Sequence, residues 1–388
     1  MCRNHAVSLL RACKVMKLAI VSCFSGQRNE MIYDWCKARG MDAALISSDF
    51  DHITKRKITD KNAEFIYIKT QPYYKNMSLQ RILSHRAFAR DAFDYIETLA
   101  PNLIYVSVPP NFMAHYAAKY KRKHPQTKIY FDLIDLWPES FPVGNIKNYP
   151  PFTFWRRLRD ANLNIADKVV TECGLYQERL AGVVDKSKMQ ILYMARHDSG
   201  IKIATQLDEQ RIQLCYLGSI NSIIDIDTIA ALIRGVAKYK PVVLHIIGDG
   251  ESREQLIESA KNAGADVKFY GKVFDEQKKH EIFSRCHFGL NIMKDTVCVG
   301  LTIKSIDYFE AELPIINTIR GDTTRLVDER GIGWNITANS GETVWQKIAG
   351  TDAEQHAKMS HAVRVMFEEL FSHNAFNRTL DKIFGSIA

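Results

Sequence analysis

The chain is 388 residues long, 46% hydrophobic and 25% charged, which is typical of a folded globular protein and excludes a disordered one. This length favours two domains over a single hydrophobic core. No apolar run approaches the roughly 18–20 residues that span a bilayer, so the sequence predicts no transmembrane helix.

The N-terminus and the cysteines indicate where the protein works. Residues 1–15 carry arginine and lysine inside their apolar part, unlike a signal peptide, and a start-like "MKLAIVS" begins at Met16. We expect residues 1–15 to be an extension outside the fold. The eight cysteines form no C-x-x-C pair and no zinc-type spacing with histidine, and several lie in apolar runs. They indicate a reducing, cytoplasmic compartment and no structural metal.

The net charge of +8 is distributed unevenly along the chain. Residues 1–200 carry 30 Lys+Arg against 19 Asp+Glu, whereas residues 201–388 carry 22 against 25. Basic stretches lie at 55–57, 119–124 and 154–159. Such an excess suits an anionic partner such as a phospholipid surface, a lipid-linked phosphate or a nucleic acid, although each stretch alone also fits a solvated helix face.

From Met16 onward, short apolar runs alternate with amphipathic segments. The first half predicts helices at about 30–40, 78–99 and 112–123, and a helix end before 168. The strands predicted between them are at 17–22, 42–47, 64–69, 102–108, 127–134, 168–173 and 189–194.

A polar stretch without a clear period, residues 195–211, is predicted to link two domains. A second alternating series follows it. The helices predicted in this series are at 225–239, 251–263, 276–284 and from about 300. The strands are predicted at 212–219, 242–250, 266–271, 287–293 and 314–317.

Near-continuous apolar strands alternating with helices predict parallel sheets covered by helices on both faces. We therefore expect an α/β protein with two doubly wound, Rossmann-like domains that face each other across a cleft. The domains are expected at 16–195 and 196–371, with a C-terminal helix at about 372–388 that packs back on the first. In such proteins ligands bind beyond the carboxyl ends of the strands.

Two glycine-containing turns follow predicted strands. In "LHIIGDGES", Gly248 and Gly250 favour a tight turn over a dinucleotide loop, because Arg253 stands where G-x-G-x-x-G needs its third glycine. In "VSCFSGQ", Gly26 allows close backbone approach by a ligand on the side of the first domain. No GxxxxGK[ST] sequence is present, which argues against a P-loop enzyme.

Several segments resemble a known enzyme family. "CYLGSI", "LHIIGDG", "VKFYGKV" and "GLTIKSIDYFEAELPII" are similar, in order and spacing, to the nucleotide-sugar domain of retaining GT-B glycosyltransferases of family 4. "FDLIDLWPES" resembles a segment of the members that build bacterial capsules, O-antigens and exopolysaccharides. The resemblance extends from about Met16 to the C-terminus and is specific at about 213–334. It implies the GT-B fold.

The resemblance assigns the diphosphate of the sugar donor to the beginning of one helix. The segment Gly300, Leu301 and Thr302 leads into a helix N-terminus, whose free N–H groups and positive dipole end suit a diphosphate. Lys304 matches the family's lysine and would neutralise charge on the leaving nucleoside diphosphate. Asp307 takes the position of the family's ribose-binding glutamate, since a carboxylate accepts from both ribose hydroxyls.

This segment also departs from the family pattern, which is similar to Gly-Leu-Pro-Asn-Lys. Thr302 and Ile303 replace the residues at its third and fourth positions. Val299 stands where members with the fuller Glu-x7-Glu motif carry a first glutamate that contacts the donor sugar. This loss leaves the identity of the sugar open and favours, as an alternative, a chain without catalytic activity.

Further positions on the donor side are carried over from the family. Gly218 and Ser219 would meet the diphosphate, Arg196 would supply positive charge that the loop after Ser219 lacks, and Gly271, Lys272 and Val273 would hold the base through backbone contacts. A tight turn at Gly218 and a solvent-facing Arg196 are the structural alternatives.

On the acceptor side, Asp132 and Asp135 follow an apolar strand, where a carboxylate is costly unless it has a partner. Relatives often place a histidine or aspartate there, so the resemblance implies a general base that takes the acceptor's proton, unless the departing phosphate does so. The alternative is that Asp135 holds the turn before Trp137. The stretch 152–159 suits either a helix on lipid head groups or a half-buried helix.

Together these features predict a metal-independent, retaining glycosyltransferase without a cofactor. It would move a sugar, most simply from a UDP-linked donor, to a lipid-linked saccharide or a growing bacterial surface polysaccharide. The expected location is the cytoplasm, with peripheral binding to the anionic inner face of the membrane. The alternatives are a catalytically degenerate GT-B subunit that supports an active transferase, and a UDP-sugar 2-epimerase. Nucleic-acid binding is not expected, because the basic stretches lack interleaved aromatic residues. A homo- or hetero-oligomer stays open.

Overall fold

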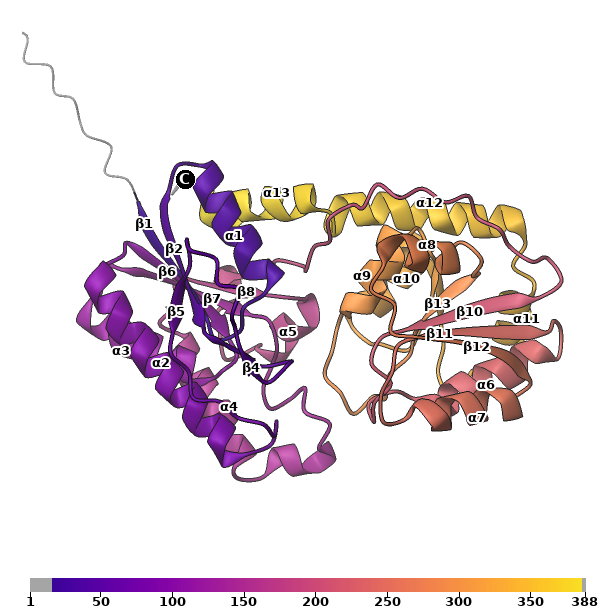
Figure 1. Cartoon of the computed structure of the whole chain (residues 1–388), viewed down its shortest axis with the longest axis horizontal. Coiled ribbons are helices and arrows are strands. Elements are labelled where there is room, and N and C mark those ends of the chain that lie inside the picture. Colours follow the sequence, from indigo (N-terminus) through magenta and orange to yellow (C-terminus); the bar gives the residue numbers. More distant parts are fainter. Residues whose placement is uncertain (1–15, 386–388) are drawn as a thin grey trace, which may run out of the picture. The chain divides into compact units, whose positions relative to one another are not determined.

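The computed structural model describes residues 16–385, which divide into two compact units (Figure 1). Of these residues, the first unit holds 16–131 and 165–167, and the second holds 132–164 and 168–385. The expected extension at 1–15 lies outside the described residues, as do the last three residues of the expected C-terminal helix. The described part of that helix is α13 (His373–Phe384).

A seven-stranded sheet has the strand order β5-β2-β1-β6-β7-β8-β9. The central β1 pairs in parallel with both β2 and β6, and β1 is buried along five of its six residues, which explains its near-continuous apolar sequence. The strands are β1 (Lys17–Ser22), β2 (Asp42–Ser48), β5 (Ile66–Ile68), β6 (Leu103–Val108), β7 (Lys128–Leu133), β8 (Lys168–Thr171) and β9 (Met189–Ile191). A small antiparallel hairpin, β3 (Phe50–Asp51) and β4 (Arg56–Lys57), follows β2.

The helices of this half of the chain alternate with its strands, as the sequence predicts. They are α1 (Gln27–Ala38), α2 (Leu79–Leu99), α3 (Phe112–Lys123), α4 (Phe152–Leu163) and α5 (Gly174–Arg179). Ser78 caps α2, because its side chain accepts a hydrogen bond from the Arg81 N–H. Two short 3-10 helices, Gly144–Asn148 and Lys186–Lys188, lie in the connections.

A six-stranded parallel sheet has the order β12-β11-β10-β13-β14-β15. Its strands are β10 (Ile212–Leu217), β11 (Val242–Ile247), β12 (Ala265–Gly271), β13 (Phe288–Asn291), β14 (Ile315–Asn317) and β15 (Gly333–Asn335). Its helices are α6 (Ile226–Ala237), α7 (Arg253–Asn262), α8 (Glu276–Phe283), α9 (Ile303–Glu310), α10 (Asp322–Arg330), α11 (Glu342–Ala349) and α12 (Ala353–Leu370).

Alternate side chains of this second sheet enter two separate cores. Leu214 and Tyr216 of β10 pack in the cluster that contains α6, α7 and α11, whereas Cys215 and Leu217 pack in the cluster that contains α8, α9, α10 and α12. This follows from the two-residue period of a strand. Figure 1 shows α6 and α7 on the face of the sheet opposite to α8 and α9.

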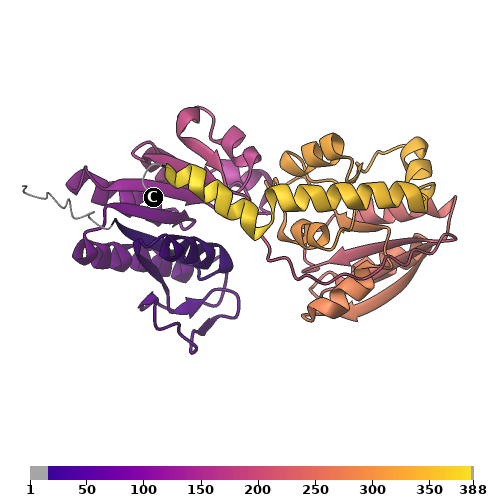
Figure 2. The ribbon, with the colours of Figure 1, turned by 90° about the horizontal axis from the view of Figure 1, so that it is seen from above.

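The α/β prediction with two Rossmann-like parallel sheets is confirmed. The strands and helices predicted up to residue 317 are present, with ends that differ by a few residues. The elements between residue 322 and residue 370 were not predicted. Figure 2 shows the longest of them, α12, followed after a short break by α13.

Candidate functional site

The strand order of the second sheet reverses at β10 and β13, which lie side by side. In open parallel sheets, ligands bind beyond the carboxyl ends of the strands at such a reversal. Gly218 and Ser219 directly follow β10, and the chain after β13 leads into α9. The candidate site is therefore built from these two connections and the loops beside them.

The loops after β10 and β11 pack backbone against backbone. A Cβ atom on Gly248 would lie 1.9 Å from the carbonyl oxygen of Gly218, and one on Gly250 would lie 2.3 Å from that of Ile220. Gly248 also has a φ of 144°, which residues with a side chain rarely adopt. The turn predicted at "IIGDG" thus requires glycine for close packing. At the end of β12, the Gly271 carbonyl accepts from the Gly248 N–H at 2.8 Å.

A chain of side-chain hydrogen bonds holds the N-terminus of α9. The Thr302 hydroxyl accepts from the Ser305 N–H at 3.2 Å and donates to the Asn291 amide oxygen at 2.7 Å. Asn291 donates to Asn317 at 3.0 Å, and Asn317 donates to Asn335 at 2.8 Å. Each asparagine ends one of three neighbouring strands. These asparagines were not predicted from the sequence, where their signal is an asparagine at the end of each of three apolar runs.

Gly300 is packed against protein rather than open to a ligand at its Cα. A Cβ there would lie 2.8 Å from the Cys173 sulfur and 2.9 Å from Leu175 Cβ. Its carbonyl accepts from the Thr323 N–H and hydroxyl at 3.0 and 2.7 Å. Leu301 is buried in the core below α9. This packing gives both residues a structural role, and their contact with the sugar donor stays a prediction.

Lys304 is the predicted site residue with the most distinctive environment. Its Nζ lies 4.7 Å from the centre of the Tyr216 ring, whose hydroxyl donates to the Ser219 carbonyl at 2.9 Å. Burial lowers the pKa of Lys304 to about 8. Its ammonium has no hydrogen-bond or ion-pair partner within residues 16–385. The structure thus places the half-buried ammonium of Lys304 beside the loop that follows β10.

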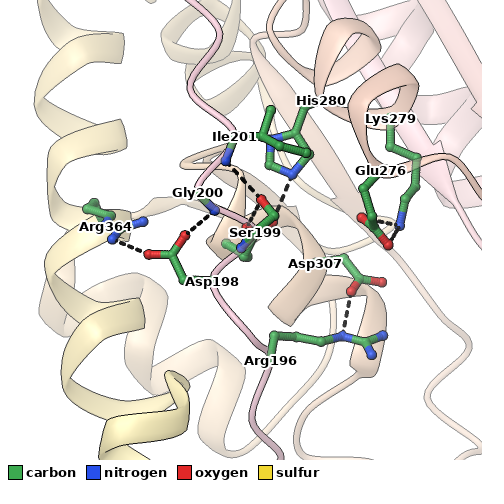
Figure 3. A network of polar contacts seen from close by, with 11 residues as sticks. Arg196, Asp198, Ser199, Gly200, Ile201, Glu276, Lys279, His280, Asp307 and Arg364 are labelled. Carbon is green, nitrogen blue, oxygen red and sulfur yellow. Dashed lines mark hydrogen bonds and ion pairs between the residues drawn. The ribbon is translucent and has the colours of Figure 1, made fainter.

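Asp307 is paired with Arg196 rather than with Lys304. The Arg196 Nε donates to Asp307 Oδ1 at 2.7 Å, and Figure 3 shows this bond below the segment that follows Arg196. Burial raises the pKa of Asp307, and the Arg196 guanidinium opposes that shift. Arg196 is therefore placed beside the predicted ribose contact. A direct contact between Arg196 and the diphosphate stays a prediction.

The predicted linker is fixed to the second sheet's helices by a buried carboxylate that the sequence analysis missed. Glu310 accepts from the Ser199 N–H and hydroxyl at 2.9 and 2.6 Å, and it pairs with His280 at 2.8 Å. Asp198 pairs with Arg364 of α12 at 2.5 Å (Figure 3). Although burial opposes it, the hydrogen bonds from His280 and Ser199 lower the pKa of Glu310. This segment has no helix or strand, but α8, α9 and α12 hold it.

The two predicted acceptor-side carboxylates lie at the end of β7. Asp132 is fully buried, and Asp135 accepts from the Trp137 indole N–H at 2.7 Å. Burial raises the pKa of Asp135, while hydrogen bonds from Ser140 and Trp137 oppose the shift. The indole bond fits the alternative role of holding the turn, and the raised pKa fits a general base. Neither role excludes the other.

The turn that carries Asp135 rests on the buried arginine of α4. Arg159 donates to both oxygens of Glu139 at 2.9 and 3.0 Å and to the Trp137 carbonyl at 3.0 Å. Arg156 also pairs with Glu139, at 2.9 Å. Two arginines of the basic stretch at 154–159 therefore bind a protein carboxylate, which leaves Phe154 and Arg157 of that stretch exposed.

Three predicted residues lie apart from these contacts. Gly26 precedes α1 in the first unit, and no atom lies within 4 Å of the position that a Cβ would take. Lys272 is exposed after β12, and Val273 packs partly against the core that contains α9.

Comparison with known proteins identifies the second sheet and its helices. Residues 211–350 match the family described as "Glycosyl transferases group 1". The matched segment runs from β10 to α11. A search of curated proteins found no match.

Solved structures share the fold of nearly the whole chain. Sucrose-phosphate synthase from Thermosynechococcus elongatus superposes with a TM-score of 0.72 at 13% identity, covering 96% of this chain and 99% of that one. HepE from Anabaena, in complex with UDP-glucose, gives 0.65 at 13% identity, covering 96% and 100%. The lipopolysaccharide outer core galactosyltransferase WaaB gives 0.65 at 13% identity, with the same coverage. These superpositions confirm the predicted GT-B fold, and the prediction of a glycosyltransferase enzyme is confirmed through the family match of residues 211–350.

Residues 16–385, the part of the chain that the structure describes, lack two features. No helix in that part of the chain is long and apolar enough to cross a membrane. Nor does it bring together three or more His, Cys, Asp and Glu side chains as a metal site would.

Proposed function

We propose that the chain is a retaining glycosyltransferase that moves a sugar from UDP to a lipid-linked saccharide or a growing bacterial surface polysaccharide. The observation that supports this most directly is Lys304 beside the N-terminus of α9, a half-buried ammonium that has no hydrogen-bond or ion-pair partner among residues 16–385. A buried cation favours an anionic ligand, and a helix N-terminus favours the same charge. UDP is the proposed nucleotide, because HepE, of the same fold, has been solved with UDP and with UDP-glucose.

In the proposed reaction, the bond between the sugar's anomeric carbon and the diphosphate oxygen breaks, and the acceptor hydroxyl bonds to that carbon. The N-terminus of α9 and Lys304 stabilise the charge that develops on the departing diphosphate. The acceptor proton goes to the departing phosphate or to a carboxylate at Asp135 or Asp132. The proposal includes no metal, since the helix and the lysine supply the positive charge.

Asp307 is proposed to hold the ribose while Arg196 holds Asp307. Arg196 occupies Oδ1 of the carboxylate, so Oδ2 has accepting capacity for the ribose hydroxyls. The Arg196 guanidinium also opposes the rise in the pKa of Asp307 that burial causes. In this arrangement Arg196 is a positioning residue.

The proposal also includes peripheral binding to an anionic membrane. Besides α4, a surface of the first unit is a candidate for this contact. The large exposed apolar side chains of that surface are Ile53, Tyr74, Met77, Leu79 and Leu83. Lys55 donates to the Asn76 amide oxygen at 2.6 Å, which joins the β3–β4 hairpin to the loop before α2. Exposed apolar groups among lysines and arginines are typical of a surface that meets lipid head groups.

A thermal-shift screen of the purified chain tests the proposal. A ligand that binds only the folded state raises the apparent stability, so UDP and at least one UDP-sugar are expected to raise Tm more than UMP or ADP. Release of UDP from that sugar in the absence of acceptor then measures hydrolysis. If no nucleoside diphosphate changes Tm, the proposed donor site is wrong.

Val299 favours a second candidate function, that of a GT-B subunit that binds nucleotide without catalysis. Its isopropyl group stands where the resembling family has a carboxylate on the donor sugar. UDP binding with neither hydrolysis nor transfer, in the presence of any acceptor, would support this candidate. Conversion of a free UDP-sugar to its C2 epimer, visible by NMR, would instead identify an epimerase.

A further inference from the structure

Two adjoining cavities of the second compact unit lie beside the proposed reaction centre. Their volumes are about 310 and 450 Å³, and both are lined by Lys147, Arg179 and Cys298. Val299, directly before the segment that leads into α9, lines the first cavity, and Glu139, four residues after Asp135, lines the second. The cavities thus lie where a sugar acceptor would stand between the two proposed reacting parts.

The charges that line these cavities do not cancel. The carboxylates on the walls are Glu139, Asp160, Glu178 and Asp295, and the cations are Lys147, Arg156, Arg179, Lys294 and Arg320. Glu139 and Asp160 are matched by Arg156 and by the buried Arg159, and Asp295 lies 3.9 Å from Arg320. Three cations, Lys147, Arg179 and Lys294, then face a single remaining carboxylate, that of Glu178.

Among the described residues, only neutral groups hold the Lys147 ammonium in place. Its Nζ donates to the Glu139 carbonyl at 3.1 Å and to the Thr296 carbonyl at 3.0 Å. An ammonium has three N–H donors, so one is left for a ligand. The two carbonyls fix the half-buried ammonium at the junction of the cavities without neutralising its charge.

Arg179, the last residue of α5, is the second cation shared by both cavities. Burial raises the pKa of the neighbouring Cys298 thiol, and the Arg179 guanidinium opposes that shift; within the described part of the chain no carboxylate forms an ion pair with Arg179. A guanidinium offers five N–H groups in a planar fork that matches two oxygens of one phosphate. Val299 adds an apolar wall, so no carboxylate there repels an anion.

We infer that these cavities bind a phosphate group of the acceptor, through Lys147 and Arg179, beside the sugar that is transferred. This inference rests on the proposed glycosyltransferase function, and it deepens that function by giving the acceptor an anionic group. The group belongs either to the diphosphate of a lipid carrier or to a phosphate ester on a sugar. Both sources share the chemistry that Lys147 and Arg179 recognise.

Binding of phosphate probes to the full chain tests the inference. Isothermal titration with inorganic pyrophosphate, farnesyl diphosphate and glucose 6-phosphate is done with UDP at saturation, so that the proposed donor site is already occupied. At least one probe is expected to bind. Lys147→Ala and Arg179→Ala are each expected to weaken it about tenfold or more, as loss of a charged hydrogen-bond partner does.

The matched control is Lys358→Ala, which removes an exposed lysine of α12 outside both cavities and leaves probe binding unchanged. Val299→Glu removes no contact and places a carboxylate on the cavity wall, so it is expected to weaken the probe as well. UDP affinity, which is expected to persist in all four variants, confirms that each is folded. Tighter binding of farnesyl diphosphate than of glucose 6-phosphate indicates a lipid carrier, and the reverse order indicates a sugar phosphate.

The inference is overturned if no probe binds the UDP-saturated chain, or if the Lys147 and Arg179 variants bind as the unmodified chain does. Failure of the proposed function would look different, because UDP itself would then not bind. In that case the same probes are titrated without UDP. Unchanged affinity in the Lys147 and Arg179 variants would again overturn the inference, and a loss would support an anion site independent of glycosyl transfer.

Discussion

At the scale of single residues, the site depends on two charges that have different partners. The Lys304 ammonium contacts the Tyr216 ring but has no hydrogen-bond or ion-pair partner among the described residues, so it is expected to meet the diphosphate directly. Lys304→Ala and Asp307→Ala should each weaken UDP binding by about 1.5–3 kcal/mol, the usual contribution of a charged hydrogen-bond partner. Calorimetric titration of UDP measures the change. Lys358→Ala, which removes an exposed lysine of α12 outside the site, is the control. Unchanged affinity in both variants would refute the assignment.

The lowered pKa of Lys304 gives UDP binding a distinctive pH dependence. The ammonium that binds the diphosphate is lost from the free chain as the pH rises through about 8, so UDP affinity should fall above that pH, by up to tenfold per unit. Below about pH 6 the terminal phosphate of UDP takes up a proton, which also weakens binding. Dissociation constants measured between these limits and above them test the profile.

The variant Lys304→Arg separates this effect from other titrations. Arginine stays protonated throughout this range, so the variant should bind UDP without the fall above pH 8. If the fall persists in Lys304→Arg, another group causes it.

At the scale of elements, the tight turn after β11 positions the loop after β10. Gly248→Ala would place a methyl group 1.9 Å from the Gly218 carbonyl oxygen at a φ of 144°, so it should destabilise the chain by about 3 kcal/mol or more and weaken UDP binding. Gly341→Ala, with no atom within 4 Å and a φ of −88°, is the matched control and should change neither. Urea unfolding midpoints of the two variants test this. A Gly248→Ala chain as stable as the control would show that the two loops can separate.

The elements themselves follow from the sequence because their cause is local. The apolar runs at β1, β10 and β11 predict buried parallel strands wherever the partners lie. The contacts of the site, in contrast, join residues that lie far apart in the sequence. Glu310 meets Ser199 across 111 residues, and the asparagine that ends β13 meets the one that ends β14 across 26. No periodic pattern contains such pairs, so the sequence indicated Lys304 and Asp307 through resemblance but not the partner that Asp307 has.

At the scale of the whole molecule, the uneven charge acquires a structural interpretation. The first unit carries basic residues around an apolar surface, whereas two arginines of α4 are already paired with Glu139. An arginine bound to a protein carboxylate has little attraction left for lipid phosphate. The surface around Tyr74 and Leu79 is therefore expected to contribute more to membrane binding than α4.

Vesicle cosedimentation of the full chain compares the two surfaces. The chain should bind vesicles of phosphatidylcholine mixed with phosphatidylglycerol and not pure phosphatidylcholine, because lysines near an anionic surface gain about 1 kcal/mol each. Tyr74→Ser and Leu79→Ser should each weaken binding by about 1 kcal/mol or more, since their apolar surface would no longer leave water. Phe154→Ser, which removes an aromatic ring of α4 that is 70% exposed, should have the smaller effect, and Phe274→Ser, 85% exposed after β12, none. If Phe154→Ser weakens vesicle binding more than Tyr74→Ser and Leu79→Ser do, α4 is the main membrane contact. If all variants bind vesicles as the unmodified chain does, neither surface contacts the membrane.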